Sequence, residues 1–524
     1  MGKIETRSWI PVKPFYSPVD LDGFDYQEKL GDAGKYPFTR GPVATIPRNA
    51  PGGGSRQAGF GTPEATNKWM KFLLKQGASS LNAPLDLPTQ IGYDCDHPMA
   101  LGEVGKAGVS VCSLADIETL FDGIALEKMA VGSVVSGIGP IYMSWMIALN
   151  EKKGVPFKDM HLWIQNDCLK EFICRGTQIF PIRQQVKFNN HAVEFCIRNN
   201  LKYAQPISIC GGHFRQAGAT AVQEMAFTMA DAIAFYEELL TRGLNAEQIG
   251  PYANHLFIGA GMDFFEEIAH IRALRRMWTK VLKERYGVVI PPMIGSRVQG
   301  RDYTAQQPLN NLIRGAIITL ATEIAGCPGS EVTAYDEALA LPTEESATLA
   351  LRTNQIVAHE SGVRNTIDPL AGSYYMEWLT DELERRAMEL FQKIEDMGGA
   401  IPAIEQGFQQ MELGRSAYEK QRQVEKGERT LIGVNKYVIN EPLKIAIRKV
   451  DPKEELRQVQ KLKKLKRERD NAKVKAGLKK LREAAREDIN LMPVLIDVVK
   501  TYATVGEMCN TLRGVFGEYR AAGL

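Results

Sequence analysis

The alternation of short apolar segments with longer amphipathic ones constrains the fold of this 524-residue chain more than any other feature. From Ala78 onward, apolar or β-rich segments typical of strands are followed by stretches with apolar residues at i, i+3, i+4 and i+7, typical of helices. The expected strands are Ser79–Leu85, Gly108–Cys112, Met129–Ser136, His161–Asn166, Pro206–Cys210, His255–Gly259, Pro292–Arg297 and Glu331–Ala334. The clearest expected helices are Pro140–Asn150, Glu224–Arg242, Phe264–Tyr286 and Leu309–Ala325.

This alternation predicts an α/β fold, because roughly eight strand–helix units over about 270 residues is the size of a TIM (β/α)8 barrel. A doubly wound open sheet is the alternative. We expect an N-terminal extension over residues 1–35, a barrel over 36–400 and a helical linker or docking region over 401–524. In the last region, Leu431–Tyr437 is expected to be extended, and the mixed-charge segment Asp451–Arg486 to form a solvated helical hairpin.

Composition excludes several classes of protein. The net charge of +2 gives no overall field for nucleic acid or an acidic membrane. Eight cysteines without a CxxC pair indicate reduced, mostly buried thiols, and the N-terminus lacks the apolar segment of a secretory signal. A cytoplasmic protein is the expectation. The glycine-rich segment Ala50–Ser55 follows no strand, so it fits a surface loop or a ligand-lining loop better than a dinucleotide fingerprint.

Three polar residues follow expected strands, where a parallel barrel carries its reactive groups. Gln165 ends one strand, and His213 follows another through two glycines that permit close backbone approach. Arg175, one to two helical turns beyond Asp167, has the guanidinium that binds carboxylates in bidentate fashion. Taken alone, the histidine and the arginine each also fit a structural or surface role. The histidine spacings do not indicate a metal site built by this chain.

Ordered blocks along most of the chain resemble the methylmalonyl-CoA mutase family. They are Tyr36–Pro42, Gly92–Val109, Ile164–Phe172, Gln216–Ala221, Asp336–Thr343, Asp368–Tyr375, Ile432–Tyr437 and Ala503–Met508. The resemblance implies a TIM-barrel substrate domain and radical interconversion of branched and linear acyl-CoAs with adenosylcobalamin, a cofactor that carries the difficult chemistry.

The resemblance also implies roles for individual residues. His213 matches the histidine that hydrogen-bonds the thioester carbonyl, Gln165 the glutamine beside it, and Arg175 the arginine that binds the free carboxylate of the acyl group. Glu337 matches the glutamate that binds the adenosyl ribose. The remaining substrate-site positions are Val43, Thr45, Ile46, Gln57, Asn82 and Gly212, and the remaining cofactor-site positions are Leu85 and Gln90.

Partner chains follow from the same resemblance. The DxHxxG motif of the family's cobalamin-binding domain does not occur in this sequence. We therefore expect a separate small cobalamin-binding subunit to supply the histidine that ligates cobalt. A heterotetramer of two large and two small subunits, and a GTPase chaperone of the mutase, are the further partners expected.

Departures from the family pattern concern the substrate pocket. Val43 and Gly212 stand where the family has tyrosines, Gln57 aligns with a further tyrosine, and Gln90 replaces a histidine. Smaller side chains should enlarge the cavity, which favours a bulky 2-aryl- or 2-alkylsuccinyl-CoA rearranging to a substituted malonyl-CoA. Pro84 stands where the hydroxyisobutyryl-CoA branch of the family has an aspartate. The alternatives are a methylmalonyl-CoA/succinyl-CoA mutase large subunit and a non-catalytic barrel subunit.

Overall fold

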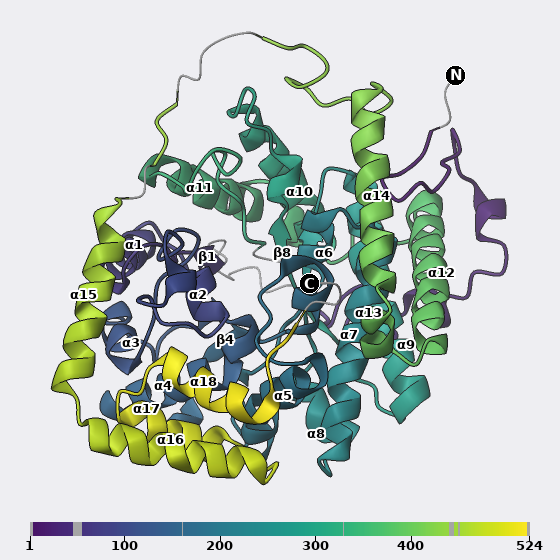
Figure 1. The fold of residues 1–524 in the computed structure, drawn as a ribbon. Coiled ribbons are helices and arrows are strands. Elements are labelled where there is room, and N and C mark those ends of the chain that lie inside the picture. The colour runs from purple at the N-terminus through teal and green to yellow at the C-terminus, as the bar shows by residue number, and fades with distance from the viewer. Residues whose placement is uncertain are drawn as a thin grey trace. The chain divides into compact units, whose positions relative to one another are not determined.

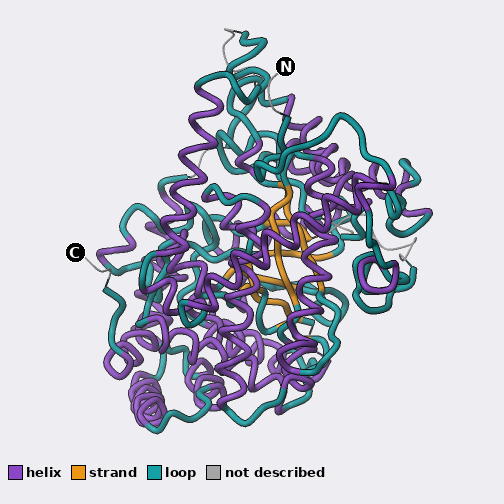
Figure 2. Tube along the Cα trace, turned by 90° about the vertical axis from the view of Figure 1, so that its right-hand side faces the viewer, coloured by secondary structure: helices purple, strands orange, loops and turns teal. Residues whose placement is uncertain are grey.

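The computed structural model describes residues 4–45, 55–159, 161–327, 330–439, 445–448 and 451–520. The chain divides into two compact units, each built from three stretches of sequence. The first unit comprises Met1–Gly54, Cys210–Ala234 and Asn254–Lys449, and the second comprises Ser55–Ile209, Phe235–Ala253 and Val450–Leu524. Strands are short in both units, and helices form much more of the chain (Figure 2).

The second unit contains a parallel five-stranded sheet in the order β1-β2-β3-β4-β5. Its strands are β1 (Ser55–Gln57), β2 (Ser80–Asn82), β3 (Val131–Val134), β4 (Leu162–Gln165) and β5 (Ala204–Gln205). The helices along this part of the chain are α1 (Pro63–Lys75), α2 (Leu87–Gln90), α3 (Leu114–Leu120), α4 (Gly139–Lys152), α5 (Ile182–Arg198) and α8 (Ala246–Ile249) (Figure 1). Alternation of strand and helix therefore produces parallel pairing, as expected for crossover connections.

Packing explains two local features of this sheet. Gly132 of β3 pairs with Trp163 of β4, and a Cβ at position 132 would lie only 1.8 Å from the indole ring, so no larger residue fits. Every residue from Gly139 to Asn150 in α4 is buried. A helix that is apolar on all sides belongs inside a core, and α4 accordingly packs against α3, α5 and α17.

The first unit contains a parallel three-stranded sheet, β6-β7-β8, formed by Ile209–Cys210, His255–Ala260 and Met293–Val298. Helix α7 (Ala221–Thr241) begins in this unit. The other helices are α6 (Gly212–Ala217), α9 (Phe264–Tyr286), α10 (Asn310–Ile324), α11 (Glu344–Glu360), α12 (Tyr374–Asp396), α13 (Ala400–Glu405) and α14 (Phe408–Glu425). The long helix α9 begins with Glu266 and Glu267 in its first turn and ends at Gly287 in the left-handed conformation (φ 72°), as charge and capping rules predict.

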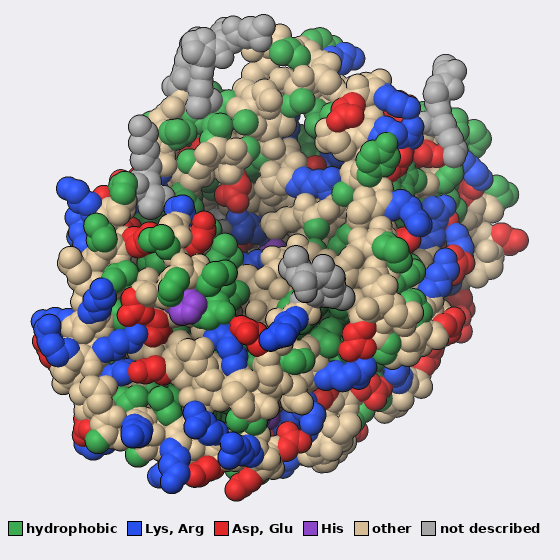
Figure 3. All heavy atoms as spheres, in the orientation of Figure 1, with side chains coloured by type: hydrophobic (Ala, Val, Ile, Leu, Met, Phe, Trp, Pro, Cys, Tyr) green, Lys and Arg blue, Asp and Glu red, His purple; other side chains and the backbone are tan. Residues whose placement is uncertain are grey.

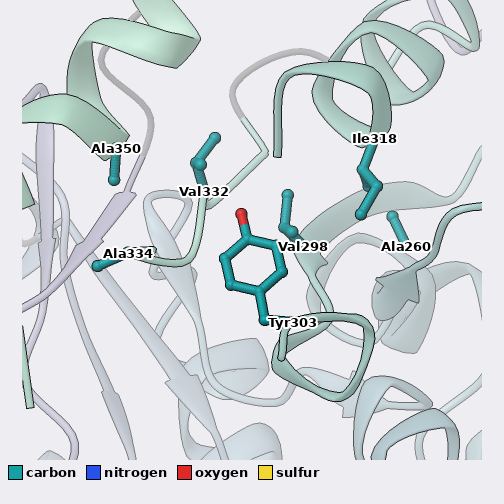
Figure 4. Close-up of a cluster of buried hydrophobic side chains, with 7 residues drawn as sticks. All are labelled: Ala260, Val298, Tyr303, Ile318, Val332, Ala334 and Ala350. Atoms are coloured by element: carbon teal, nitrogen blue, oxygen red, sulfur yellow. The ribbon is translucent and has the colours of Figure 1, made fainter. Parts of the chain in front are cut away.

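A buried cluster beside β8 anchors the segment that follows this strand (Figure 4). The cluster consists of Ala260, Val298, Tyr303, Ile318, Val332, Ala334 and Ala350. The Tyr303 hydroxyl donates a hydrogen bond of 3.1 Å to the Thr333 carbonyl, which satisfies the one polar atom that the ring brings into the core. Val298 and Tyr303 therefore fix both ends of the short segment between them.

The C-terminal segment of the second unit is helical: α15 (Lys453–Glu468), α16 (Asn471–Arg486), α17 (Met492–Lys500) and α18 (Val505–Phe516). Leu462 of α15 is buried among Cys95, Ala100, Val104 and Cys112, whereas most other residues of α15 and α16 are exposed or partly exposed. Both helices predicted over 451–486 are formed, but the predicted hairpin is not, because α15 and α16 run at a wide angle to each other and do not pack together (Figure 1). On the face that Figure 3 draws, Lys and Arg are interspersed with Asp and Glu, so neither sign forms a continuous field.

Several sequence predictions need correction. Glu331 forms only an isolated bridge with Arg297, and Val109 only isolated bridges, so the strands predicted over 331–334 and 108–112 are not formed as such. Residues 431–437 turn instead of extending: Gly433 has φ 85° and its N–H donates to the Lys436 carbonyl at 2.8 Å. Strand β1 was not predicted.

The sheet pairing gives five strands and three strands in separate sheets, and no closed ring among the residues that the structure describes. The mixed α/β class is confirmed, whereas the TIM barrel and the boundaries at 35/36 and 400/401 stay predictions. The eight cysteines are thiols, of which seven are buried and Cys174 is partly exposed. No helix among the described residues has both the length and the apolar character to cross a membrane.

Candidate functional site

Two strands of the parallel sheet in the second unit end at a buried residue with an amide side chain. Asn82 is the last residue of β2 and Gln165 the last residue of β4, with 4% and 3% of their surfaces exposed. Neither Asn82 Oδ1 nor Gln165 Oε1 has a hydrogen-bond partner in the described part of the chain. A buried polar atom without a partner costs about 1–3 kcal/mol, so a ligand that supplies partners would recover that free energy. These carboxyl ends of strands are suited to ligand binding.

Arg175 ends a single π-helical turn, Glu171–Arg175, that follows β4. Such turns often occur at functional sites. Its Nη1 donates hydrogen bonds to Gln90 Oε1 at 2.5 Å, Ser136 Oγ at 3.1 Å and Glu171 Oε1 at 3.2 Å. The Arg175 side chain is 23% exposed, so one nitrogen is held by protein while part of the guanidinium remains accessible. This arrangement fixes the direction of a cation that a carboxylate can reach.

The residues that hold Arg175 form a connected group, here named the Glu171 cluster: Gln90, Ser136, Lys170, Glu171 and Arg175. Ser136 Oγ donates to Glu171 Oε1 at 2.6 Å. The fully buried Lys170 Nζ lies 2.9 Å from the same carboxylate oxygen and donates to the Asp167 carbonyl at 2.6 Å. The Glu171 carboxylate therefore pairs with two cations, Lys170 and Arg175, and orients both.

Two positions predicted to contact the cofactor lie in the same unit. Gln90 and Leu85 are both fully buried, and Gln90 Nε2 donates to the Leu85 carbonyl while its Oε1 accepts from Arg175. Gln90 therefore also holds Arg175 in place, a role that the sequence did not predict. Contact with a cofactor at Gln90 or Leu85 stays a prediction.

His213 lies in the first turn of α6, directly after β6 in the first unit. Its Nδ1 lies 3.3 Å from Cys210 Sγ, and the residue is partly exposed. Packing excludes a side chain at Gly211 and leaves little room for one at Gly212. A Cβ at Gly211 would lie 2.3 Å from Thr228 Oγ1, and one at Gly212 would lie 3.3 Å from the backbone nitrogen of Gly259. These close approaches hold the histidine at the carboxyl end of its sheet.

Glu337 belongs to the first unit as well. Its Oε1 accepts a hydrogen bond of 3.1 Å from Arg297 Nη2, an arginine of β8. The Glu337 side chain is 35% exposed, so the carboxylate is held on one side and accessible on the other. That combination is suited to binding a hydroxyl group, such as those of a ribose.

The remaining predicted substrate positions lie in or after the segment that departs from the family pattern. Val43 and Thr45 are exposed residues of an irregular stretch. Ile46 lies outside the described residues, as does most of Ala50–Ser55. Gln57 pairs through its backbone with Asn82 in the register of β1 and β2, and its side chain is not among those described.

Sequence reasoning missed Ser136, Lys170 and Glu171, which orient Arg175. A signal for each was present. Ser136 closes the predicted strand Met129–Ser136, and Lys170 and Glu171 stand within the block Ile164–Phe172. Their pairing depends on a turn that brings residues 35 positions apart into contact, which a linear pattern does not reveal.

Comparison with known proteins covers nearly the whole chain. A family model described as methylmalonyl-CoA mutase matches residues 5–518. The 2-hydroxyisobutanoyl-CoA mutase large subunit of Aquincola tertiaricarbonis is 39% identical over 516 residues, which are 97% of this chain and 91% of that protein. The probable mitochondrial methylmalonyl-CoA mutase of Caenorhabditis elegans is 37% identical, covering 99% of this chain and 70% of its own. The human mitochondrial methylmalonyl-CoA mutase is 36% identical, covering 98% and 69%.

Proposed function

Because this chain belongs to the methylmalonyl-CoA mutase family of acyl-CoA mutases, which are isomerases, we propose that it is the large, substrate-binding subunit of an adenosylcobalamin-dependent carbon-skeleton mutase acting on a carboxylated acyl-CoA. The observation that supports a carboxylated substrate is the orientation of Arg175. Its guanidinium is held at one nitrogen by Gln90, Ser136 and Glu171 and remains partly accessible.

The chain's own residues bind and orient the substrate in this proposal. Arg175 pairs with the free carboxylate of the acyl group, and His213 donates a hydrogen bond to the thioester carbonyl. The amides of Asn82 and Gln165, whose oxygens lack partners among the described residues, bind polar atoms of the same substrate. Each such contact restricts the motion of the acyl group, which lowers the entropic cost of reaching a reactive geometry.

The size of the acyl group is the finer part of the proposal. We propose a 2-aryl- or 2-alkylsuccinyl-CoA, because Val43 replaces a family tyrosine. Gly212 contributes less to this argument than the sequence implied, since the β7 backbone lies 3.3 Å from where a Cβ would stand. The relative from Aquincola is named for 2-hydroxyisobutanoyl-CoA, whose acyl group has no carboxylate. Arg175 and Pro84 favour a carboxylated substrate over that one.

Two alternatives compete with this substrate. A methylmalonyl-CoA/succinyl-CoA mutase large subunit would use the same Arg175 contact, and three of the similar proteins carry that activity in their names. A non-catalytic barrel subunit would not need oriented polar groups. The connected Glu171 cluster and the accessible Glu337 carboxylate favour a catalytic subunit.

Adenosylcobalamin would supply the radical that starts the rearrangement. Glu337 fits the adenosyl ribose, because its carboxylate is accessible and its orientation is fixed by Arg297. We propose that a small subunit binds the corrin and ligates cobalt, as the words "large subunit" in one relative's name support. A heterotetramer, a GTPase chaperone and a cytoplasmic location complete the proposal.

The decisive experiment combines the chain with its small subunit and adenosylcobalamin and measures turnover of a panel of acyl-CoAs. The panel contains methylmalonyl-, 2-hydroxyisobutanoyl-, 2-alkylsuccinyl- and 2-arylsuccinyl-CoA. Preference for a substituted succinyl-CoA supports the bulky substrate, whereas turnover of methylmalonyl-CoA alone contradicts it. Absence of turnover on the whole panel, with no cobalamin-dependent radical signal, would support the non-catalytic alternative.

A further inference from the structure

A cavity in the first unit is lined almost entirely by positive charge. Its volume is about 340 Å³, which includes space open to solvent. Its lining residues are Arg7, Arg215, Ala219, Gln299, Arg301, Asp302, Lys420 and Arg429. Five of these eight residues are cations and one is an acid, so the lining has a large excess of positive charge.

A single carboxylate, that of Asp302, lines the cavity together with the five cations. Asp302 Oδ1 lies 2.5 Å from Arg7 Nη1 and 3.8 Å from Arg429 Nη2, so one acid serves two arginines. Burial opposes ionisation of Asp302, but the two arginines outweigh burial and lower its pKa. Arg215 pairs with Glu267 and, at 3.5 Å, with Glu224.

Other acids of the neighbouring helix α9 are engaged elsewhere. Asp263 Oδ2 accepts the backbone N–H of Arg7 at 3.0 Å, and Glu266 Oε2 accepts that of Ser8 at 2.8 Å. Lys420 and Arg301 therefore face the cavity without a carboxylate partner among the described residues. Lys420 Nζ donates to the Ala219 carbonyl at 2.7 Å, and Arg301 Nη1 donates to the Arg215 carbonyl at 3.4 Å.

Two buried polar atoms of the lining residues also lack hydrogen-bond partners in the described part of the chain. These are Gln299 Oε1 and Arg215 Nη1, on residues that are 4% and 6% exposed. An unpaired buried donor is costly, and more so when it carries charge. The guanidinium of Arg215 therefore offers a donor that only a ligand or solvent in the cavity could satisfy.

The electrostatics of Lys420 support the same conclusion. Burial, together with Arg215 and Arg301, lowers the pKa of its ammonium group to about 6. Burial and neighbouring Arg7 likewise lower the pKa of Arg429 to about 10. Both pKa values are lowered because the cations lie close together and are partly removed from water. A bound anion would raise them again.

We propose that this cavity is a binding site for a phosphate group, either free or as part of a phosphate ester. Arginine presents several N–H donors in a planar fork that matches tetrahedral oxyanions, and lysine adds a compact charge. The cavity is preorganised on one side, because Gln299, Arg301 and Asp302 lie between the core residues Val298 and Tyr303 (Figure 4).

The phosphate site is distinct from the thioester contact proposed for His213. Arg215 follows His213 by two positions in α6, and residues i and i+2 of a helix do not share a face. The site would thus exist whichever acyl group the enzyme isomerises, and its test requires neither the small subunit nor cobalamin.

The test is calorimetric titration of the whole chain with sodium phosphate, compared with sodium chloride at the same ionic strength and pH 7.5. Wild type should bind phosphate saturably. Arg301→Gln should weaken binding about tenfold or more because it removes a charged donor, and Lys420→Met should do the same because it removes an amine that a bound phosphate would hold in the protonated form. Arg415→Gln is the matched control, since Arg415 lies on α14 with Lys420 but is 78% exposed and paired with Glu412. It should bind as wild type does.

Absence of saturable phosphate binding by wild type would overturn the proposal, as would equal affinity in wild type and Arg301→Gln. Arg301 is exposed, so that variant should fold even if Lys420→Met does not. A competition arm identifies the source of the phosphate. Displacement of phosphate by coenzyme A would assign the site to a phosphate of the acyl-CoA, whereas unchanged binding would assign it to a separate phosphate compound.

Discussion

Two groups of arginines in the first unit, one fully buried in α9 and one partly exposed around the cavity, differ in their partners. In α9, Arg272 pairs with Asp368 at 3.1 Å and Glu377 at 2.7 Å, and Arg276 pairs with Asp381 and Glu384, each at 2.5 Å. Around the cavity, Arg7 and Arg429 share Asp302. Arg272 and Arg276 are neutralised by the fold itself, which identifies them as structural. Of the cavity arginines, Arg215 has two acids, Glu224 and Glu267, whereas Arg7 and Arg429 share one.

The Glu171 cluster of the second unit is intermediate between these two groups. Its cations Lys170 and Arg175 share one carboxylate, but serine and glutamine side chains complete their hydrogen bonds. Arg175 is therefore oriented without being fully neutralised. Arg272 and Arg276 thus have two acids each, whereas Lys170 with Arg175, and Arg7 with Arg429, share one acid per pair.

The largest effect on stability is expected at Arg272. Arg272→Met should lower the free energy of unfolding by about 3–5 kcal/mol, because Glu377 would be left buried without its cation and Asp368 would keep only Arg40, at 3.7 Å. Urea unfolding measures this change. Arg385→Gln in α12, whose arginine is 53% exposed, is the control and should change stability by less than about 1 kcal/mol. Equal effects in both variants would contradict a structural role for the α9 arginines.

At Arg175 the expected effect falls on turnover instead of stability. Arg175→Gln should lower kcat/KM for carboxylated acyl-CoAs roughly 10- to 150-fold, the value of about 1.5–3 kcal/mol for a hydrogen bond to a charged group. It should not lower kcat/KM for an uncarboxylated acyl-CoA, if one is turned over. Steady-state kinetics of the assembled enzyme measure both, with Arg385→Gln again as control. Unchanged selectivity would exclude Arg175 as the carboxylate ligand.

The pH dependence of stability tests whether the cations around the cavity are destabilised by one another, and Lys420 is the group that should show it. Its folded-state pKa of about 6 lies below the ordinary 10.5, so the unfolded chain binds more protons between these values. Stability should therefore rise with pH from about 6 toward 10.5, with a slope of at most about 1.4 kcal/mol per pH unit from this group. In chloride buffer, Lys420→Met should unfold with a shallower pH dependence than wild type. Identical slopes in wild type and Lys420→Met would mean that burial and the neighbouring arginines do not lower the pKa of Lys420.

The smallest effect is expected at Arg301. Arg301→Gln should leave the free energy of unfolding unchanged or raise it by a few tenths of a kcal/mol, because it removes a cation that repels Arg215 and Arg7. Chemical denaturation in chloride buffer measures this difference. A loss of more than about 1 kcal/mol would place Arg301 with the structural arginines of α9.

Much of the fold was predictable where local signals agreed. The predicted bounds of α9 match the structure, since an amphipathic stretch ends at Gly287. Residues 431–437 were predicted wrongly because their apolar and β-branched composition conceals a competing side chain. Asn435 Oδ1 accepts the Leu431 N–H at 2.7 Å and stabilises a turn.

The site was predictable only in part. Arg175, His213 and Glu337 were identified through the family resemblance, and the structure gives each of them a defined partner. The cavity was not predicted, because its arginines come from positions as distant as Arg7 and Arg429 and no motif connects them. Partners of buried charges depend on tertiary contacts, which a sequence pattern does not contain.

Ser136 has φ 44°, a left-handed conformation that glycine adopts more easily than serine. Such a backbone costs on the order of 1–3 kcal/mol. Glycine would relieve that strain but would remove the hydroxyl that contacts Gln90, Lys170, Glu171 and Arg175. Stability and the orientation of Arg175, the proposed carboxylate ligand, therefore make opposite demands on Ser136. A variant with glycine at this position would relieve the backbone strain only by losing the contact that orients the proposed ligand.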